Sequence, residues 1–471
     1  MSRESQLVKN TFILSLGSFL PKLVSFITLP IITGCLTKAE LGHYDLISTL
    51  VSLIIPVATL QIHSGAFRFL IESRKDPVRS GSIISSIAAF CLPVMLLVSA
   101  LVALIYPGFD WKLRVLLGLY FLLDGLSITM GQILRGLGHN RYYSANSIIT
   151  AVVSCVCIVL TVYNARLGLY GIILSYVLSL TVSLCYAFFR AGLGRYLSRG
   201  AVSREMMKEL IAYSWPMIPN NLSNWVLSLS DRFVITGFLG IEANAVYAVA
   251  NKIPNIIRIG QTILIMAWQE SAALAVKDED AGAYYSKMFG HMLSILVGFT
   301  ALLIGFAPLL FRIFIRGDYG ESYPQLPILF LGILFSCMAS FMGGIYVAHK
   351  KTKNVGVTTI GAAVINLAVD FLLISRVGIY AGSISTLVAY LALYVFRCVN
   401  VRRFQPMEFQ VGRQIVCFLI ILGMLAVCYL NRPVLNILNA AAGVAVFVVF
   451  NLDTLKALYR KAKKMIPGRK E

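Results

Sequence analysis

Apolar runs of about twenty residues recur along almost the whole chain, and no other feature of the sequence limits the fold as strongly. A helix that rises 1.5 Å per residue needs roughly 20 apolar residues to cross a bilayer, so each run is long enough to span it. Strands of a membrane β-barrel would instead alternate in segments of about ten residues. The sequence therefore predicts an all-α polytopic membrane protein, whose fourteen expected spans are 10–36, 42–70, 81–106, 113–135, 143–163, 168–190, 210–238, 243–268, 285–315, 324–348, 354–375, 378–400, 413–430 and 433–453.

The charge distribution predicts the orientation of these spans. The chain is 58% hydrophobic and carries a formal net charge of +20, which in a soluble protein would point to nucleic acid. Most of the 41 Lys and Arg, however, fall at the two termini and in alternate loops on one side of the expected spans. This asymmetry is the positive-inside signal. It predicts that both termini lie in the cytoplasm, that anionic membrane lipids lie near the basic tail 456–471, and that nucleic acid is not a partner.

The chain also contains an internal repeat. Residues 164–175 and 374–385 match at an offset of 210, and His139 and His349 keep the same offset. An offset of six spans keeps the membrane orientation, so the halves form a parallel repeat about an axis along the membrane normal. The predicted organisation is an N-terminal six-helix lobe (1–191), a cytoplasmic linker (192–209), a C-terminal six-helix lobe (210–405), two additional helices (406–455) and the basic cytoplasmic tail (456–471).

Several ionisable residues lie inside the apolar runs, where each costs about 2.5–3.5 kcal/mol on insertion scales. Asp231 and Arg232 are adjacent, so their side chains point about 100° apart and their partners must come from other helices or from water. Cations outnumber anions, and a shared cavity lined by them would suit a phosphate or pyrophosphate. The alternative role is interhelical pairing or snorkelling that only fixes packing. The candidate substrate-binding cations are Lys22, Arg68, Arg232, Lys252 and Arg258, and the candidate ion-coupling carboxylates are Asp124, Asp231 and Asp370.

Amides and aromatic rings accumulate around the seventh and eighth spans. Pro216 and Pro219 are expected to interrupt the backbone hydrogen bonding at the start of the seventh span. Amide groups beside aromatic faces suit the hydroxyls and CH faces of sugars. The alternative is that Trp anchors the membrane interface and that Asn serves helix packing. The candidate sugar contacts are Asn220, Asn221, Asn224, Trp225, Asn251 and Gln261.

Short motifs give the chain a family resemblance. Between about residues 7 and 405 it resembles the polysaccharide transporter branch of the multidrug/oligosaccharidyl-lipid/polysaccharide exporter superfamily, through "TKAELGHYDL", "GHNRYYS", "SLSDRFVITGFLG", "ANAVYAVANKI" and the paired "GLYG" and "GIYAG". Members resembling it are O-antigen-type flippases of the bacterial inner membrane. They move undecaprenyl-pyrophosphate-linked oligosaccharide repeat units between leaflets by alternating access of two lobes around a cationic cavity.

The resemblance also assigns roles to individual residues. Lys22 would take the place of a basic residue in the first helix, and Lys252 or Arg258 that of one in the eighth. The lipid II flippase branch carries two further helices, as this chain does, but also an Arg-Asp pair in the first helix, where this chain has "PKLV". That departure argues against lipid II as the cargo.

The sequence leaves the class of transporter open while indicating that the chain is not an enzyme. It contains no G-x-x-x-x-G-K-[ST] phosphate loop, so membrane potential or a proton or sodium gradient is the expected energy source, and no cofactor, metal or catalytic residue is expected. The alternatives are a cation-coupled multidrug exporter of the same superfamily, or a membrane polysaccharide polymerase or ligase. We expect a monomer, with polysaccharide assembly proteins as candidate partners.

Overall fold

The computed structural model describes residues 3–105, 108–276, 278–452 and 454–456, and these residues form helices and connections without any β-strand. Eleven helices of this described part are long and apolar enough to cross a membrane. The first helix adds a shorter apolar stretch, Phe19–Cys35. The all-α polytopic fold predicted from hydropathy is therefore confirmed, while residues 457–471 of the predicted basic tail lie outside the described residues.

The helices form two compact units, which are described here one at a time. The first contains Met1–Ala245 and Phe314–Gly317, and the second contains Val246–Ile313 and Asp318–Glu471. This division follows compactness, whereas the predicted linker at 192–209 follows the sequence repeat. The predicted domain boundaries therefore stay a prediction.

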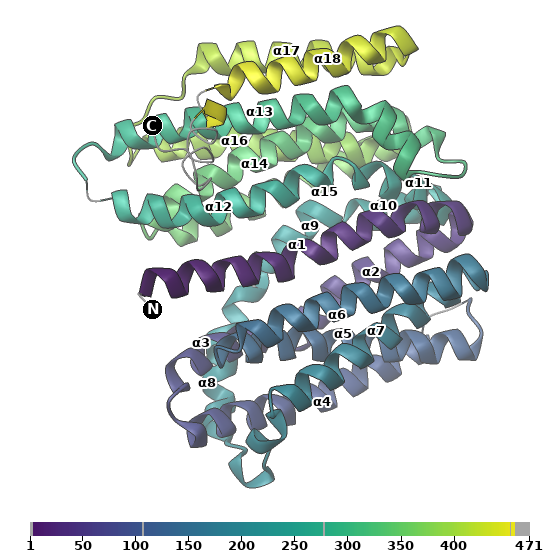
Figure 1. Cartoon of the computed structure of the whole chain (residues 1–471), viewed down its shortest axis with the longest axis vertical. Helices are drawn as coiled ribbons and strands as arrows, with labels where there is room; N and C mark the ends of the chain where they lie inside the picture. The colour runs from purple at the N-terminus through teal and green to yellow at the C-terminus, as the bar shows by residue number, and fades with distance from the viewer. Residues whose placement is uncertain (1–2, 106–107, 277, 453, 457–471) are drawn as a thin grey trace, which may run out of the picture. The chain divides into compact units, whose positions relative to one another are not determined.

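The first unit is a bundle of long helices followed by a series of short ones (Figure 1). Helix α4 packs against α5, α6 against α7, α1 against α6, and α3 against α5. Its elements are α1 (Arg3–Cys35), α2 (Lys38–Ala58), α3 (Ile62–Ser73), α4 (Pro77–Ile105), α5 (Trp111–Gly136), α6 (Asn140–Ile158) with the π-helical η1 (Val159–Asn164), α7 (Gly168–Arg190), the 3₁₀ turns η2 (Leu193–Tyr196) and η3 (Arg199–Ala201), α8 (Arg204–Ser214), the 3₁₀ turn η4 (Trp215–Met217), α9 (Ile218–Leu229) and α10 (Asp231–Leu239).

The expected continuous span 42–70 is wrong, because the chain breaks between α2 and α3. Leu60 and Gln61 adopt left-handed backbone conformations, with φ of 50° and 58°. Pro56 already weakens the end of α2, since its ring prevents a normal helical hydrogen bond. The turn is held instead by the amide of Gln61, which donates to the carbonyl of Pro56 at 2.9 Å, and by the hydroxyl of Thr59, which donates to the carbonyl of Ile55 at 2.7 Å.

Two further expected spans are also divided. The interruption predicted at Pro216 is confirmed by the 3₁₀ turn η4, and the same span breaks again at Ser230, just before Asp231. The span expected at 243–268 separates into α11 (Ile241–Lys252) and α12 (Asn255–Ala275), because Pro254 cannot continue the hydrogen-bonded ladder.

The second unit repeats packing relations of the first. Helices α15 and α16 pack together as α6 and α7 do, α14 packs on α16 as α5 does on α7, and α12 packs on α14 as α3 does on α5. Helices α17 and α18 follow as a hairpin (Figure 1). The elements after α12 are α13 (Ala281–Phe314), the 3₁₀ turn η5 (Gly320–Gln325), α14 (Leu326–Ala348), α15 (Thr352–Val377), α16 (Tyr380–Arg402), α17 (Val411–Leu430) and α18 (Pro433–Phe450).

Candidate functional site

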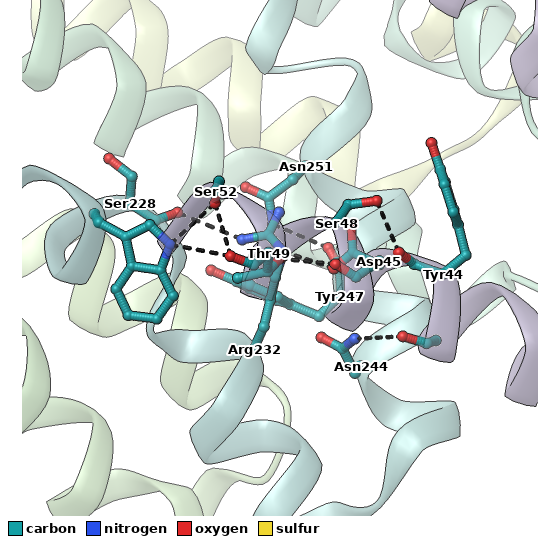
Figure 2. A network of polar contacts seen from close by, with 12 residues as sticks. Tyr44, Asp45, Ser48, Thr49, Ser52, Ser228, Arg232, Asn244, Tyr247 and Asn251 are labelled. Atoms are coloured by element: carbon teal, nitrogen blue, oxygen red, sulfur yellow. Dashed lines mark hydrogen bonds and ion pairs between the residues drawn. The ribbon is translucent and has the colours of Figure 1, made fainter. Parts of the chain in front are cut away.

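A buried ion pair joins two helices of the first unit. Nε of Arg232, on α10, donates to Oδ2 of Asp45, on α2, at 2.6 Å. Each residue is only 7% exposed. The expectation that the partner of Arg232 comes from another helix is therefore confirmed, and Figure 2 shows the guanidinium directed at the carboxylate.

The two charges meet because they lie at the same distance from neighbouring helix ends. Asp45 follows the start of α2 by about 10 Å along the helix, and Arg232 precedes the end of α10 by about 10 Å. Near those ends, the side-chain amide of Asn244 donates to the carbonyl of Gly42 at 3.2 Å. A Cβ added at Gly42 would collide with the carbonyl oxygen of Ile241. The glycine thus permits the close approach that fixes the depth of both charges.

Polar groups on one face of α2 extend this contact towards α9. Nε1 of Trp225 donates to the carbonyl of Thr49 at 3.2 Å and to the hydroxyl of Ser52 at 3.1 Å. Nη1 of Arg232 adds a long contact to the carbonyl of Ser228, at 3.4 Å. Residues 45, 49 and 52 share a face at helical spacing, so α2 presents a polar stripe to α9 and α10 (Figure 2).

A cluster of tyrosines lies in the first unit beside one of the candidate coupling carboxylates. The hydroxyls of Tyr44 and Tyr176 are 2.8 Å apart, and the rings of Tyr120 and Tyr176 have centroids 5.7 Å apart. Asp124 follows Tyr120 by one helical turn on α5 and is half-buried. This cluster forms a polar interior between α2, α5 and α7.

The other predicted residues of the first unit occupy more varied surroundings. Lys22 is half-buried on α1, and Asp231 is buried at the start of α10. Arg68 is exposed on α3 and pairs with Glu72 at 2.7 Å, with side chains 52% and 49% exposed. The three candidate amides on α9 are also exposed, and one of them donates to the backbone of another at 2.8 Å; these are Asn220, Asn221 and Asn224.

In the second unit, one predicted cation has a clear aromatic partner. Nη2 of Arg258 donates to the hydroxyl of Tyr390 at 3.0 Å, and its guanidinium carbon lies 5.5 Å from the centre of that ring. Asp370 is fully buried on α15. The remaining candidates of this unit, Asn251, Lys252 and Gln261, are half-buried.

Two of the predicted site residues contact the polar face of α2: Arg232 at Asp45, and Trp225 at Thr49 and Ser52. Sequence reasoning missed Asp45 itself, although its distance from the end of α2 matches that of Arg232 from the end of α10. It also missed Arg397 in the second unit, which is 5% exposed and donates to the hydroxyls of Thr358 and Thr359, each at 3.1 Å. Arg397 stands near the end of an apolar run, where an arginine is ordinary.

The fold is that of a multi-pass membrane protein, and it resembles the folds of solved membrane transporters. The inward-facing conformation of a multidrug resistance MATE family transporter of the MOP superfamily is similar, with a TM-score of 0.69, 15% identity and coverage of 81% of this chain and 95% of that one. A MOP superfamily transporter from Pyrococcus furiosus is similar with a TM-score of 0.57, 14% identity and coverage of 84% and 95%. At these identities the likeness shows the fold.

The family follows from the sequence comparison. A family model described as "Polysaccharide biosynthesis protein" matches residues 7–269, more than half of the chain, and the chain belongs to this family. No curated protein matches it. The solved structures that share its fold are those of transporters.

Proposed function

We propose that this protein is a flippase that translocates undecaprenyl-pyrophosphate-linked oligosaccharide repeat units across the bacterial cytoplasmic membrane for surface polysaccharide biosynthesis. Membership of a polysaccharide biosynthesis family supports the cargo class. The observation that carries the proposal is the buried Arg232–Asp45 pair, because it holds a guanidinium inside the membrane-spanning part with an exchangeable anionic partner. Transport proceeds by alternating access, with both termini in the cytoplasm.

The chemistry of the pair explains how an anionic cargo would be held. A guanidinium binds carboxylate and phosphate oxygens through the same planar array of donors. Leaving either charge of a buried pair without its partner costs about 3–5 kcal/mol, so Arg232 requires an anion in every state. Asp45 supplies it in this structure. The cargo pyrophosphate takes its place when it binds, with Lys22, Lys252 and Arg258 as further candidate cations. Arg68, which is exposed and paired with Glu72, is the least suited of the predicted cations.

The same exchange provides a route for ion coupling. A coupling cation bound by Asp45 would neutralise the negative charge that competes with the cargo, and Arg232 would then bind pyrophosphate. When the cargo leaves, Asp45 would release the cation and pair with Arg232 again. Asp45 thereby joins Asp124, Asp231 and Asp370 as a candidate coupling carboxylate.

The test is transport of a fluorescent pyrophosphate-linked oligosaccharide in proteoliposomes. Arg232→Ala should reduce the rate at least about tenfold, equivalent to about 1.4 kcal/mol of lost binding, while the exposed Arg141→Ala is the matched control. The charge swap Asp45→Arg with Arg232→Asp keeps an ion pair but moves the guanidinium to α2. We expect the swapped protein to fold and to transport poorly; transport at the wild-type rate would show that the pair only joins helices.

A second candidate function is drug export, favoured by the multidrug transporters among the similar structures. An intramembrane guanidinium repels the cationic compounds that such exporters carry, which is why we place this function second. Efflux of a cationic dye from the same proteoliposomes distinguishes the two functions. Dye efflux without oligosaccharide translocation would overturn the flippase proposal.

A further inference from the structure

The connection between α7 and α8 is held tightly against α4. The hydroxyl of Ser85 donates to the carbonyl of Tyr196 at 2.9 Å and accepts from the amide of Ser198 at 3.1 Å. The hydroxyl of Ser86 accepts from the amide of Ser203 at 3.0 Å and donates to its carbonyl at 3.3 Å. Residues 193–203, which we call the connector, are therefore fixed to α4 by side-chain hydrogen bonds within the first unit.

Two adjacent cavities lie where the connector meets α4. The larger, about 420 Å³, is lined by α4, α5, α7 and the connector, and the smaller, about 390 Å³, by α4 and the connector. Both volumes fall within the range of small-ligand pockets. Ala88, Leu92 and Leu197 line both cavities, so the two share a wall. Leu197 is 42% exposed.

The lining of the larger cavity suits hydrocarbon. It carries no charged side chain. Apart from two threonines and two cysteines, every lining residue has a hydrocarbon or methionine side chain. Water is held poorly by such walls, because an apolar cavity offers it few hydrogen-bond partners. Phe189, which also lines this cavity, is 75% exposed. The cavity is therefore open to a lipid chain.

Positive charge gathers beside the smaller cavity. Arg199 lines it, and Arg190 and Arg195 are exposed nearby along the chain. Within the residues that the structure describes, none of these three arginines forms an ion pair with a carboxylate. Burial, and after it the charges of Arg195 and Arg74, lower the pKa of His139, so the charge of Arg195 also reaches this ring between α5 and α6. These arginines supply the positive charge expected at a site for a phosphate group.

We propose that an anionic glycerophospholipid binds at the connector, with one acyl chain in each cavity on either side of Leu197 and with its phosphate group held by Arg195 and Arg199. The two cavities match the two chains of such a lipid; Arg199 lines the smaller cavity at the connector, and Arg195 is an exposed residue of the same connector. The lipid fastens the connector to α4. This site is separate from the Arg232–Asp45 pair and does not depend on which cargo the protein carries.

The first experiment compares lipids bound to the purified full-length protein by native mass spectrometry. Phosphatidylglycerol should bind more tightly than phosphatidylcholine with the same acyl chains, and inorganic phosphate should not compete with it. The double variant Arg195→Ala with Arg199→Ala should weaken phosphatidylglycerol binding about tenfold, since two cations are lost. The control is Arg204→Ala with Lys208→Ala, which removes the same charge from exposed positions on α8 outside the cavities.

Equal binding of the two lipids, or an equal loss in the control variant, would overturn the proposal. Competition by inorganic phosphate would also overturn it, by showing a simple anion site. The acyl chains are tested by Ala88→Phe, which fills the wall shared by both cavities, against Ala100→Phe at an exposed position on the same helix. We expect weaker phosphatidylglycerol binding for the first alone. If Ala88→Phe does not fold, the arginine variants decide the matter.

Discussion

Among the residues that the structure describes, two guanidinium groups are buried, those of Arg232 and Arg397, and their partners differ as expected for a proposed binding group and a structural one. Arg232 in the first unit is held by the carboxylate of Asp45. Arg397 in the second unit is held by neutral oxygens, those of two threonine hydroxyls and of the Ala339 carbonyl, the last at 2.8 Å. The carboxylate partner of Arg232 can be replaced by another anion, whereas the neutral oxygens of α14 and α15 that hold Arg397 offer no charge for an anionic cargo to replace.

The surroundings of Arg397 fit a structural role. Its contacts join α16 to α14 and α15, and Gly343 lies so close that an added Cβ would be 3.1 Å from Nη1. The guanidinium thus occupies a space built for it. Arg232 instead belongs to the polar stripe on α2, where Trp225 donates to two further groups. We expect the two arginines to respond differently when stability and transport are measured separately.

The largest effect should follow from removing one member of the ion pair. Asp45→Ala leaves Arg232 buried without its carboxylate and should lower the free energy of unfolding by about 3–5 kcal/mol. Denaturant unfolding in detergent measures this loss. The exposed Glu205→Ala is the control for removing a carboxylate from the first unit.

Replacement of both members distinguishes stability from function. Asp45→Leu with Arg232→Met removes the two buried charges together, which is often neutral or stabilising. We expect this double variant to recover most of the stability lost by Asp45→Ala and to remain inactive in transport. Transport by the double variant at the wild-type rate would show that the pair only joins helices, as Arg397 does.

Arg397→Met should have the next largest effect. It leaves the Ala339 carbonyl and two hydroxyls without their donor and should cost about 3 kcal/mol, since hydrogen bonds to charged groups contribute about 1.5–3 kcal/mol each before partial compensation. Transport normalised to folded protein should stay unchanged. A loss of transport without a loss of stability would show that Arg397, like Arg232, takes part in transport.

The sequence predicted the fold because the bilayer leaves few alternatives to apolar helices. It did not predict the break at Leu60 and Gln61, since neither residue type favours a left-handed backbone. The two breaks at proline residues are easier to predict. The break at Pro216 was expected, and Pro254 could have predicted the second break in the same way. The sequence therefore predicts helix breaks that are caused by proline. It does not predict a break formed by non-glycine residues in a left-handed backbone conformation.

The candidate site was predictable only in part. A charge inside an apolar run marks Arg232, but its partner depends on which helices pack together, and sequence spacing does not determine that. Comparing distances from the helix ends would have drawn attention to Asp45. No such comparison identifies Arg397, because its partners are neutral groups of kinds that occur throughout the chain.

A smaller loss should follow from closing the space that sets the depth of the pair. Gly42→Ala introduces a Cβ that collides with the carbonyl of Ile241, so α2 must shift at its first turns, at a cost of about 2 kcal/mol for overpacking. Because Asp45 follows three residues later, transport should fall together with stability. Gly237→Ala, where an added Cβ meets nothing within 4 Å, is the matched control.

The smallest effect is expected at Arg68, whose guanidinium pairs with Glu72 on the surface of α3. An exposed pair one helical turn apart contributes about 0–1 kcal/mol, so Arg68→Ala should barely change the unfolding midpoint, and less still at high salt. Transport should remain near the wild-type rate, because this arginine already has a solvated partner. A marked fall in transport at unchanged stability would instead show that Arg68 contacts the cargo, as its position in an apolar run predicts. Buried and exposed cations would then both take part in cargo binding.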